Sequence, residues 1–274
     1  MLMNILITGA TDGIGLETAK ILAEQGHTIL LHGRNEKKLT AVCKTLKNST
    51  IVPFVADLSR LIEVKRLAEQ LSHEVSGIDV LINNAGVYGA PETVTAEGLD
   101  IRFAVNTIAP YTLTKALLPL MSSSSRVINV SSAAQQEVEV DALLGKKVLP
   151  DGDAYAQSKL ALTMWTIEMA KQQAPAFIAI NPKSLLGSKM VKSAFGIEGH
   201  IEGHDVKIGA KILVDAALSD EFKNASGKYY DNDSCQFVNP HQDASSQVKR
   251  SRLVQILEKL IRSDGAPEHD EISR

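Results

Sequence analysis

The sequence predicts a doubly wound α/β fold: a mainly parallel sheet with helices on both faces, built as a single domain. Short apolar runs alternate with amphipathic stretches of helix length along most of the 274 residues. Runs such as NILIT and VLINN carry no polar alternation, which is typical of strands covered on both faces. Because strand, helix and strand follow one another repeatedly, we expect parallel pairing through right-handed crossovers.

Each expected element follows from its pattern of apolar residues and from the turn residues that bound it. The expected strands are Asn4–Thr8, Thr28–His32, Ile51–Val55, Val80–Asn83, Arg126–Val130, Phe177–Asn181 and Lys228–Asp231. The expected helices are Ile14–Gln25, Glu36–Lys47, Arg60–His73, Leu99–Leu120, Ala154–Lys171 and Gln247–Ile261.

We expect one domain over residues 1–262, because no linker rich in Pro and Gly divides the chain. Two long connections, 133–153 and 183–206, interrupt the alternation, and long loops in compact domains commonly form lids or binding loops. Residues 263–274 are polar and are expected to form a flexible tail.

The composition excludes several classes of function. Lys and Arg number 29 against 32 Asp and Glu, so the formal charge is −3 and no strongly basic field exists to bind nucleic acid. No apolar run is long enough to span a membrane, and the chain does not start like a signal peptide. Cys43 and Cys235 lack the spacing of a thiolate metal site. We therefore expect a cytoplasmic protein with a small-molecule partner and no metal, nucleic acid or membrane span.

A glycine-rich turn, TGATDGIG over 8–15, follows the first strand and opens the first helix. Gly9 permits the sharp turn, Gly13 lets the backbone approach a pyrophosphate, and Gly15 allows the helix to pack closely on the sheet. The helix N-terminus then offers free N–H groups to the phosphates. A tight turn without a ligand is the alternative, and the strand–turn–helix context favours the phosphate interpretation.

Tyr155 and Lys159 stand four residues apart on an expected helix, so their side chains leave the same face one turn apart. Hydride transfer to a carbonyl creates an alkoxide that needs a proton donor, and a phenol can supply the proton. An ammonium about 5 Å away contributes roughly 3 kcal/mol at an effective dielectric of about 20. We therefore expect Lys159 to lower the pKa of Tyr155 by about 2 units. The alternative is an incidental Tyr and Lys on an amphipathic helix.

Five motifs, taken together and in this order, resemble the short-chain dehydrogenase/reductase family. They are the T-G-x-x-x-G-x-G turn, NNAG over 83–86, Asn106, Ser131-Ser132, and YAQSK over 155–159. The resemblance covers roughly residues 4 to 235, and the long segment before Tyr155 is most similar to the retinol-dehydrogenase or carbonyl-reductase type. It implies a Rossmann-type sheet, an NAD(P)-dependent oxidoreductase acting on CH–OH or C=O, and a homodimer or homotetramer in which the helices at 99–120 and 154–171 pair across a two-fold axis.

The family resemblance also implies roles for individual residues. Ser132 would hydrogen-bond the substrate oxygen, Tyr155 would exchange the proton, Lys159 would also hold the nicotinamide ribose, and Asn106 would anchor a water-linked proton path. Ser131 is the competing serine. The residues expected to bind the cofactor are Gly9, Thr11, Asp12, Gly13, Ile14, Gly15, Arg34, Asp57, Leu58, Asn84, Ala85, Gly86, Tyr155, Lys159, Pro182 and Ser188.

The end of the second strand favours NADP(H) over NAD(H). Gly33 stands where NAD-selective relatives carry an acid for the ribose 2′-OH, and the guanidinium of Arg34 suits a 2′-phosphate. Asp12, at a position that is often basic in NADP-preferring members, is a signal for NAD(H), which stays possible. Asp57 resembles the residue that accepts from the adenine amino group, and it also suits a helix N-cap or turn.

One departure from the family concerns the loop after the sixth strand. The family usually carries Pro-Gly there, and this chain has Pro182-Lys183. A positive φ would strain a lysine by about 1 kcal/mol or more, so the local path is expected to differ. The apolar residues of 133–153 suit either a substrate lining or burial in a helical turn, and both interpretations stay open.

The sequence thus predicts an NADP-dependent enzyme that transfers a hydride between nicotinamide and a ketone, aldehyde or alcohol. Two alternatives remain. The same fold can reduce a C=C bond or a ring substrate, or the domain can sense a nucleotide without catalysis.

Overall fold

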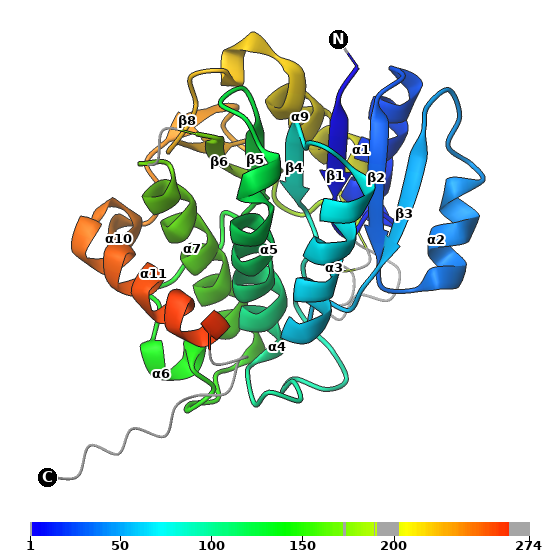
Figure 1. The fold of residues 1–274 in the computed structure, drawn as a ribbon. Helices are drawn as coiled ribbons and strands as arrows, with labels where there is room; N and C mark the ends of the chain where they lie inside the picture. The colour runs from blue at the N-terminus through cyan, green and yellow to red at the C-terminus, as the bar shows by residue number, and fades with distance from the viewer. Residues whose placement is uncertain (1, 172–173, 189, 191–202, 263–274) are drawn as a thin grey trace, which may run out of the picture.

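The computed structural model, which describes residues 2–171, 174–188, 190 and 203–262, is organised around an eight-stranded sheet in the order β3-β2-β1-β4-β5-β6-β7-β8 (Figure 1). All neighbouring strands pair in parallel except β7 and β8, which are antiparallel. The strands are β1 (Asn4–Ile7), β2 (Thr28–Gly33), β3 (Ile51–Val55), β4 (Val80–Asn83), β5 (Arg126–Val130), β6 (Ala176–Asn181), β7 (Tyr229–Asp231) and β8 (Gln236–Val238). The predicted doubly wound α/β class is confirmed.

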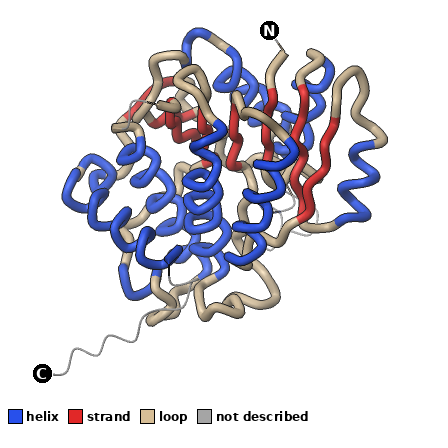
Figure 2. Tube along the Cα trace, viewed as in Figure 1, coloured by secondary structure: helices blue, strands red, loops and turns tan. Residues whose placement is uncertain are grey.

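Helices cover both faces of the sheet, as Figure 2 shows. On one face lie α1 (Gly13–Glu24), α2 (Glu36–Cys43) and α9 (Val206–Leu218), where α1 packs against α9. On the other face lie α3 (Leu61–Glu74), α5 (Ala109–Leu117), α7 (Asp151–Met169) and α11 (Gln247–Arg262). The short helices are α4 (Ile101–Phe103), α6 (Val140–Leu143) and α10 (Gln242–Ser245).

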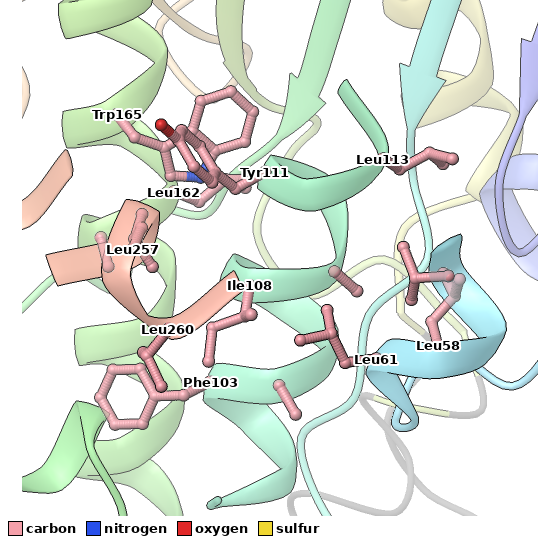
Figure 3. Close-up of a cluster of buried hydrophobic side chains, with 14 of the residues drawn as sticks. Leu58, Leu61, Phe103, Ile108, Tyr111, Leu113, Leu162, Trp165, Leu257 and Leu260 are labelled. Carbon is pink, nitrogen blue, oxygen red and sulfur yellow. The ribbon is translucent and has the colours of Figure 1, made fainter. Parts of the chain in front are cut away.

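The strands explain why two separate cores form. Successive side chains of a strand point to opposite faces, so Ile5 and Ile7 enter the core under α1 and α9, whereas Leu6 enters the core under α3, α5 and α7. Both faces are therefore apolar, as the uninterrupted runs predict. Trp165 of α7 and Tyr111 of α5 meet edge-on in the second core, with ring centroids 5.5 Å apart (Figure 3).

The stretch predicted as one helix over Leu99–Leu120 is broken, and that prediction is wrong in detail. A π-helix covers Ala104–Ile108 between α4 and α5, and a 3-10 turn covers Leu118–Leu120. Pro110 has no N–H with which to close an α-helical bond to the carbonyl of Asn106. Single π-turns inside helices occur frequently at functional sites, and this one carries Asn106.

Helix α11 lies across α7 and against α5, on the face expected to pair across a two-fold axis (Figure 1). Leu253, Leu257 and Leu260 are buried there, as Figure 3 shows for the last two. The Tyr111 hydroxyl donates to Glu258 at 2.6 Å, and Lys115 pairs with the same carboxylate at 3.0 Å. The outer faces of α5 and α7 are therefore covered in part by this chain's own helix.

The connection over 133–153 contains α6 and ends where α7 begins. Leu143 and Leu149 are buried in the core on the α7 face, and neither residue lines the cofactor groove described below. Burial in a helical turn is thus the interpretation that the structure favours for these leucines. The other long connection, 183–206, lies largely outside the described residues, as does the predicted tail 263–274.

Candidate active site

A groove of about 540 Å³ crosses the carboxyl ends of the parallel strands. Its walls come from the ends of β1, β2, β3, β4, β5 and β6, and from the start of α7. Ligands of open parallel sheets bind at this edge. Every residue predicted to bind the cofactor lines the groove except Gly15, which packs directly beneath it.

The turn after β1 has the conformation that its glycines permit. Gly9 and Gly13 have φ values of 65° and 54°, which favour glycine. A Cβ on Gly9 would lie 2.8 Å from the Cα of Ala85, and one on Gly15 would lie 2.4 Å from Nδ2 of Asn84. Side chains at these positions would therefore push the turn and the β4 loop apart.

Hydrogen bonds tie this turn to its neighbours. The Nδ2 group of Asn84 donates to the carbonyls of Thr8 at 2.9 Å and Gly9 at 3.1 Å. The Asp12 carboxylate caps α1 by accepting from the Gly13 N–H at 2.9 Å. Asn83, in contrast, donates to Oδ1 of Asn129 at 2.8 Å and so joins β4 to β5.

His32 is a groove residue that the sequence reasoning missed. Its Nδ1 accepts from the Gly9 N–H at 3.2 Å, and its Nε2 lies 3.0 Å from the Ala56 carbonyl, to which it can donate. Burial lowers the pKa of His32 to about 4, so the ring is neutral near pH 7. The available signal in the sequence was a histidine at the end of the strand that pairs with the one before the glycine-rich turn. His32 supports this turn from the β2 side.

The two ends of the groove carry different side chains. At one end, Arg34 and Lys38 are exposed and lie close to Gly33. A Cβ added at Gly33 would lie only 2.5 Å from the Cγ2 of Thr11. Lys38, in the first turn of α2, was also missed. Asp57 accepts from the Ser59 N–H at 2.9 Å, so the predicted turn role is present.

At the other end, Tyr155 and Lys159 leave α7 toward the groove, with the Lys159 Nζ 5.7 Å from the Tyr155 ring centroid. The ammonium donates to the Val130 carbonyl at 2.7 Å and is buried, so its pKa falls to about 8. Burial raises the pKa of Tyr155, a hydrogen bond with Ser132 lowers it, and the nearby Tyr88 raises it.

The expected lowering of the Tyr155 pKa by Lys159 is therefore wrong for this structure. The spacing predicted proximity, but burial of the phenol opposes ionisation and its effect is the largest. A further aromatic group, Tyr88, was missed. Its ring centroid lies 5.1 Å from that of Tyr155, and the two rings are tilted by 49°.

The two candidate serines lie in different environments. Ser131 is buried, with its hydroxyl 2.7 Å from that of Thr163 on α7. Ser132 is more exposed and hydrogen-bonds Tyr155, and its hydroxyl also accepts from the Ala134 N–H at 3.1 Å. Ser132 is thus the serine beside the phenol.

Asn106 lies behind the groove wall. Its Nδ2 donates to the Val87 carbonyl at 2.9 Å and to the Ser158 hydroxyl at 3.0 Å, and its Oδ1 accepts from the Val87 N–H at 2.8 Å. These bonds join the π-helix, the β4 loop and α7. Asn106 holds three elements of the site together.

The loop after β6 keeps a positive φ despite its lysine. Lys183 has a φ of 136° and Leu185 a φ of 52°, so the strain expected of a lysine at a positive φ is present. Whether the path differs from the family's stays a prediction. Pro182, Lys183 and Ser188 all line the groove.

Comparisons with known proteins agree with this geometry. Residues 3–194 match the family described as short chain dehydrogenase. Retinol dehydrogenase 13 of Homo sapiens is 28% identical, over 96% of this chain and 88% of its own length. A crystal structure of a putative uncharacterized protein from Mycobacterium Paratuberculosis has a TM-score of 0.79 and 27% identity, covering 95% of this chain and 93% of that one.

A further structure, described as a putative short chain dehydrogenase from Shigella flexneri 2a complexed with NADP, has a TM-score of 0.67 and 27% identity, over 84% of this chain and 97% of that chain. The chain belongs to the short-chain dehydrogenase/reductase family. It is thus an NAD(P)-dependent oxidoreductase with a Rossmann-type fold, similar to retinol dehydrogenases. Within the described residues, no helix has the length and apolar character needed to cross a membrane.

Proposed function

We propose that this enzyme uses NADP(H) to reduce a ketone or aldehyde, with Tyr155 as the general acid. The observation that carries the proposal is that Tyr155, Lys159 and Ser132 line the same groove as the glycine-rich turn. A phosphate-binding turn and a proton donor in one groove are the two parts that hydride transfer to a carbonyl needs.

The groove suits a nicotinamide dinucleotide. The start of α1 opens onto the groove at Gly13 and Ile14, and a helix N-terminus favours a pyrophosphate there. A side chain at Gly9 would meet Ala85. Thr11, Ile14 and Ser188 would hold the phosphates, and Lys159 the nicotinamide ribose. The cofactor, when bound, supplies the hydride.

The residues of this chain then handle the proton. The Ser132 hydroxyl donates to the carbonyl oxygen of the substrate and orients it beside the Tyr155 hydroxyl. The raised pKa of Tyr155 keeps the phenol protonated near neutral pH, so it is ready to give its proton to the forming alkoxide. Lys159, with a pKa of about 8, stands close enough to stabilise the phenolate that remains. These properties support Tyr155 as the general acid when the reaction runs as a reduction.

The preference for NADP(H) is supported by the walls of the groove near β2. Thr11 occupies the space where a side chain at Gly33 would begin, so an acid cannot enter there without movement. Arg34 and Lys38 are exposed to the groove and both suit a 2′-phosphate. Asp12 is the opposing signal, but its carboxylate already caps α1.

The proposal is tested by following NADPH consumption with a panel of aldehydes and ketones. Retinal belongs in the panel because the human relative is named a retinol dehydrogenase. Turnover that is lost in Tyr155→Phe supports the proposal. Cofactor binding without turnover of any compound supports the nucleotide-sensing alternative, and turnover of activated C=C substrates alone supports the second enzymatic alternative.

The cytoplasmic location and the homodimer or homotetramer stay predictions. Because α11 covers part of α5 and α7, we propose that a dimer or tetramer would form either through the exposed part of these two helices or through a different face of the molecule. Light scattering of the wild-type enzyme measures its mass directly.

A further inference from the structure

The strained loop Pro182–Ser188 is held by a short segment that follows the neighbouring strand, β7. Asp231, Asn232 and Asp233, here called the DND segment, lie where β7 ends and the turn to β8 begins. β7 pairs with β6 in parallel, so the carboxyl ends of both strands reach the same edge. The DND segment therefore stands beside the loop that follows β6.

Asp233 makes most of the contacts to the loop. Its carboxylate accepts from the Ser184 N–H at 3.0 Å, from the Ser184 hydroxyl, and from Nδ2 of Asn181 at 2.9 Å. The Lys183 ammonium lies farther away, 3.7 Å from the nearer carboxylate oxygen. Burial acts to raise the pKa of Asp233, but the hydrogen bonds from Ser184 and Asn181 together lower it, so Asp233 is ionised near neutral pH.

The rest of the DND segment fixes the start of the loop. Nδ2 of Asn232 donates to the Pro182 carbonyl at 2.8 Å, and its N–H donates to the Asn181 carbonyl at 3.1 Å. Asp231 accepts from Nδ2 of Asn181 at 2.7 Å. The contacts thus bracket Lys183 on both sides, at Asn181 and Pro182 before it and at Ser184 after it.

The strain at Lys183 explains why so many contacts are needed. A lysine at a φ of 136° persists only where its surroundings over-determine the conformation. A different backbone at Lys183 would also move Pro182, which lines the groove, and would redirect the chain toward Ser188. A Cβ on Gly13 would lie 3.9 Å from the Ser188 Cβ, so this loop reaches the phosphate turn.

We propose that Asp233 is a positioning residue for the cofactor: it holds Lys183 in its strained conformation so that the loop Pro182–Ser188 forms one wall of the groove. The inference rests on the proposed function, because it assigns this wall to the bound nucleotide. Asp233 itself does not line the groove and acts through the backbone of Lys183 and Ser184.

A set of variants separates backbone strain from the ion pair. Lys183→Gly removes the strain and the ammonium, whereas Lys183→Ala removes the ammonium and keeps the strain. Asp233→Asn is made in the parent, in Lys183→Ala and in Lys183→Gly. The dissociation constant of NADPH is measured for all six proteins by fluorescence titration.

If Asp233 holds the strained backbone, Asp233→Asn weakens NADPH binding by about tenfold in the parent and in Lys183→Ala. In Lys183→Gly it changes the dissociation constant by less than about twofold, because glycine adopts the conformation unaided. Equal weakening in all three backgrounds, or none in any, overturns the proposal. Weakening in the parent alone assigns the effect to the ion pair and overturns it too.

A second readout needs no cofactor. Asp233→Asn is expected to accelerate hydrogen exchange of the Ser184 amide in the parent and in Lys183→Ala. In Lys183→Gly the same substitution removes only one hydrogen bond, so the acceleration there should be smaller. Unchanged exchange in Asp233→Asn overturns the clamp. Failure of the wild-type enzyme to bind NADPH, with the exchange pattern as expected, overturns the proposed function and the cofactor role while the clamp itself stands.

Discussion

The two ends of the groove are built in different ways. At the phosphate end, the positive φ values fall on Gly9 and Gly13, and the charged side chain of Arg34 is exposed. At the reacting end, a positive φ falls on Lys183, and the charged group of Lys159 is buried beside a phenol of raised pKa. The first end is unstrained and solvated, and the second is strained and desolvated.

This difference separates binding from chemistry. Phosphate groups are held well by backbone N–H groups and exposed cations, which need no burial. At the reacting end, burial shifts the pKa values of both groups: it lowers that of Lys159 to about 8 and raises that of Tyr155, which keeps the phenol protonated. We therefore expect substitutions at the phosphate end to change affinity, and substitutions of the buried groups Tyr155 and Lys159 to change turnover and its pH dependence.

The largest effect is expected at the reacting end. Tyr155→Phe removes the proton donor and keeps the ring, so turnover falls by about a thousandfold. The ring stays in place, so the affinity for NADPH changes by less than about threefold. Steady-state rates and fluorescence titration measure the two quantities. Tyr230→Phe, which removes a hydroxyl in the core under α9, is the matched control, and turnover that survives Tyr155→Phe contradicts the assignment.

The buried ammonium of Lys159 should make stability depend on pH. Its pKa falls from 10.5 to about 8 on folding, which corresponds to about 3 kcal/mol. Between these two pH values the unfolded chain binds the proton and the folded chain does not, so the wild-type free energy of unfolding gains this amount as the pH rises. Below pH 8 the cost of burying the charge is present in full.

Lys159→Met removes this dependence. The difference in the free energy of unfolding between Lys159→Met and the wild type should therefore be about 3 kcal/mol more favourable to the variant at pH 7 than at pH 10.5. The lost bond to Val130 adds an offset that is the same at both pH values. Urea unfolding at several pH values measures the difference. Lys47→Met, at an exposed lysine, should show no such trend. A pH-independent difference for Lys159→Met would show that the ammonium is not desolvated.

The sequence predicted the strands closely because their apolar runs are uninterrupted. Ile51–Val55, Val80–Asn83 and Arg126–Val130 were predicted with the bounds that the structure has. The helix predicted over Leu99–Leu120 was wrong because apolar spacing cannot reveal a π-turn. Helix α9 and strand β8 were missed, since the irregular stretches around them carry no clear periodicity.

The residues of the site also fall into those that the sequence could predict and those that it could not. The glycine turn, Arg34 and the Tyr155–Lys159 pair were found because fixed spacing on known elements brings them together. The contacts of Tyr88 and Asp233 could not be found, because they depend on which distant segments meet at the sheet edge. The direction of the Tyr155 pKa was wrong since spacing reports proximity and says nothing of burial.

At the phosphate end, an added methyl group should act through crowding. A Cβ at Gly15 would lie 2.6 Å from the Gly9 carbonyl oxygen, so Gly15→Ala is expected to lower the free energy of unfolding by about 1–3 kcal/mol. That corresponds to a fall in melting temperature of roughly 2–4 °C per kcal/mol. Gly89→Ala is the matched control, because nothing lies within 4 Å of its Cβ position. Equal melting temperatures for the two variants would contradict close packing at Gly15.

The smallest effect is expected at Arg34, because the group is exposed and solvent screens its charge. Arg34→Ala should weaken NADPH binding by about tenfold and leave NADH binding within about twofold. Lys37→Ala, at an exposed position that does not line the groove, should change neither. Because an exposed contact is screened by salt and a buried one is not, the NADPH effect should also shrink at high ionic strength. An equal loss for both cofactors would mean that Arg34 holds the turn rather than the 2′-phosphate, and the phosphate end would then lose its exposed recognition group.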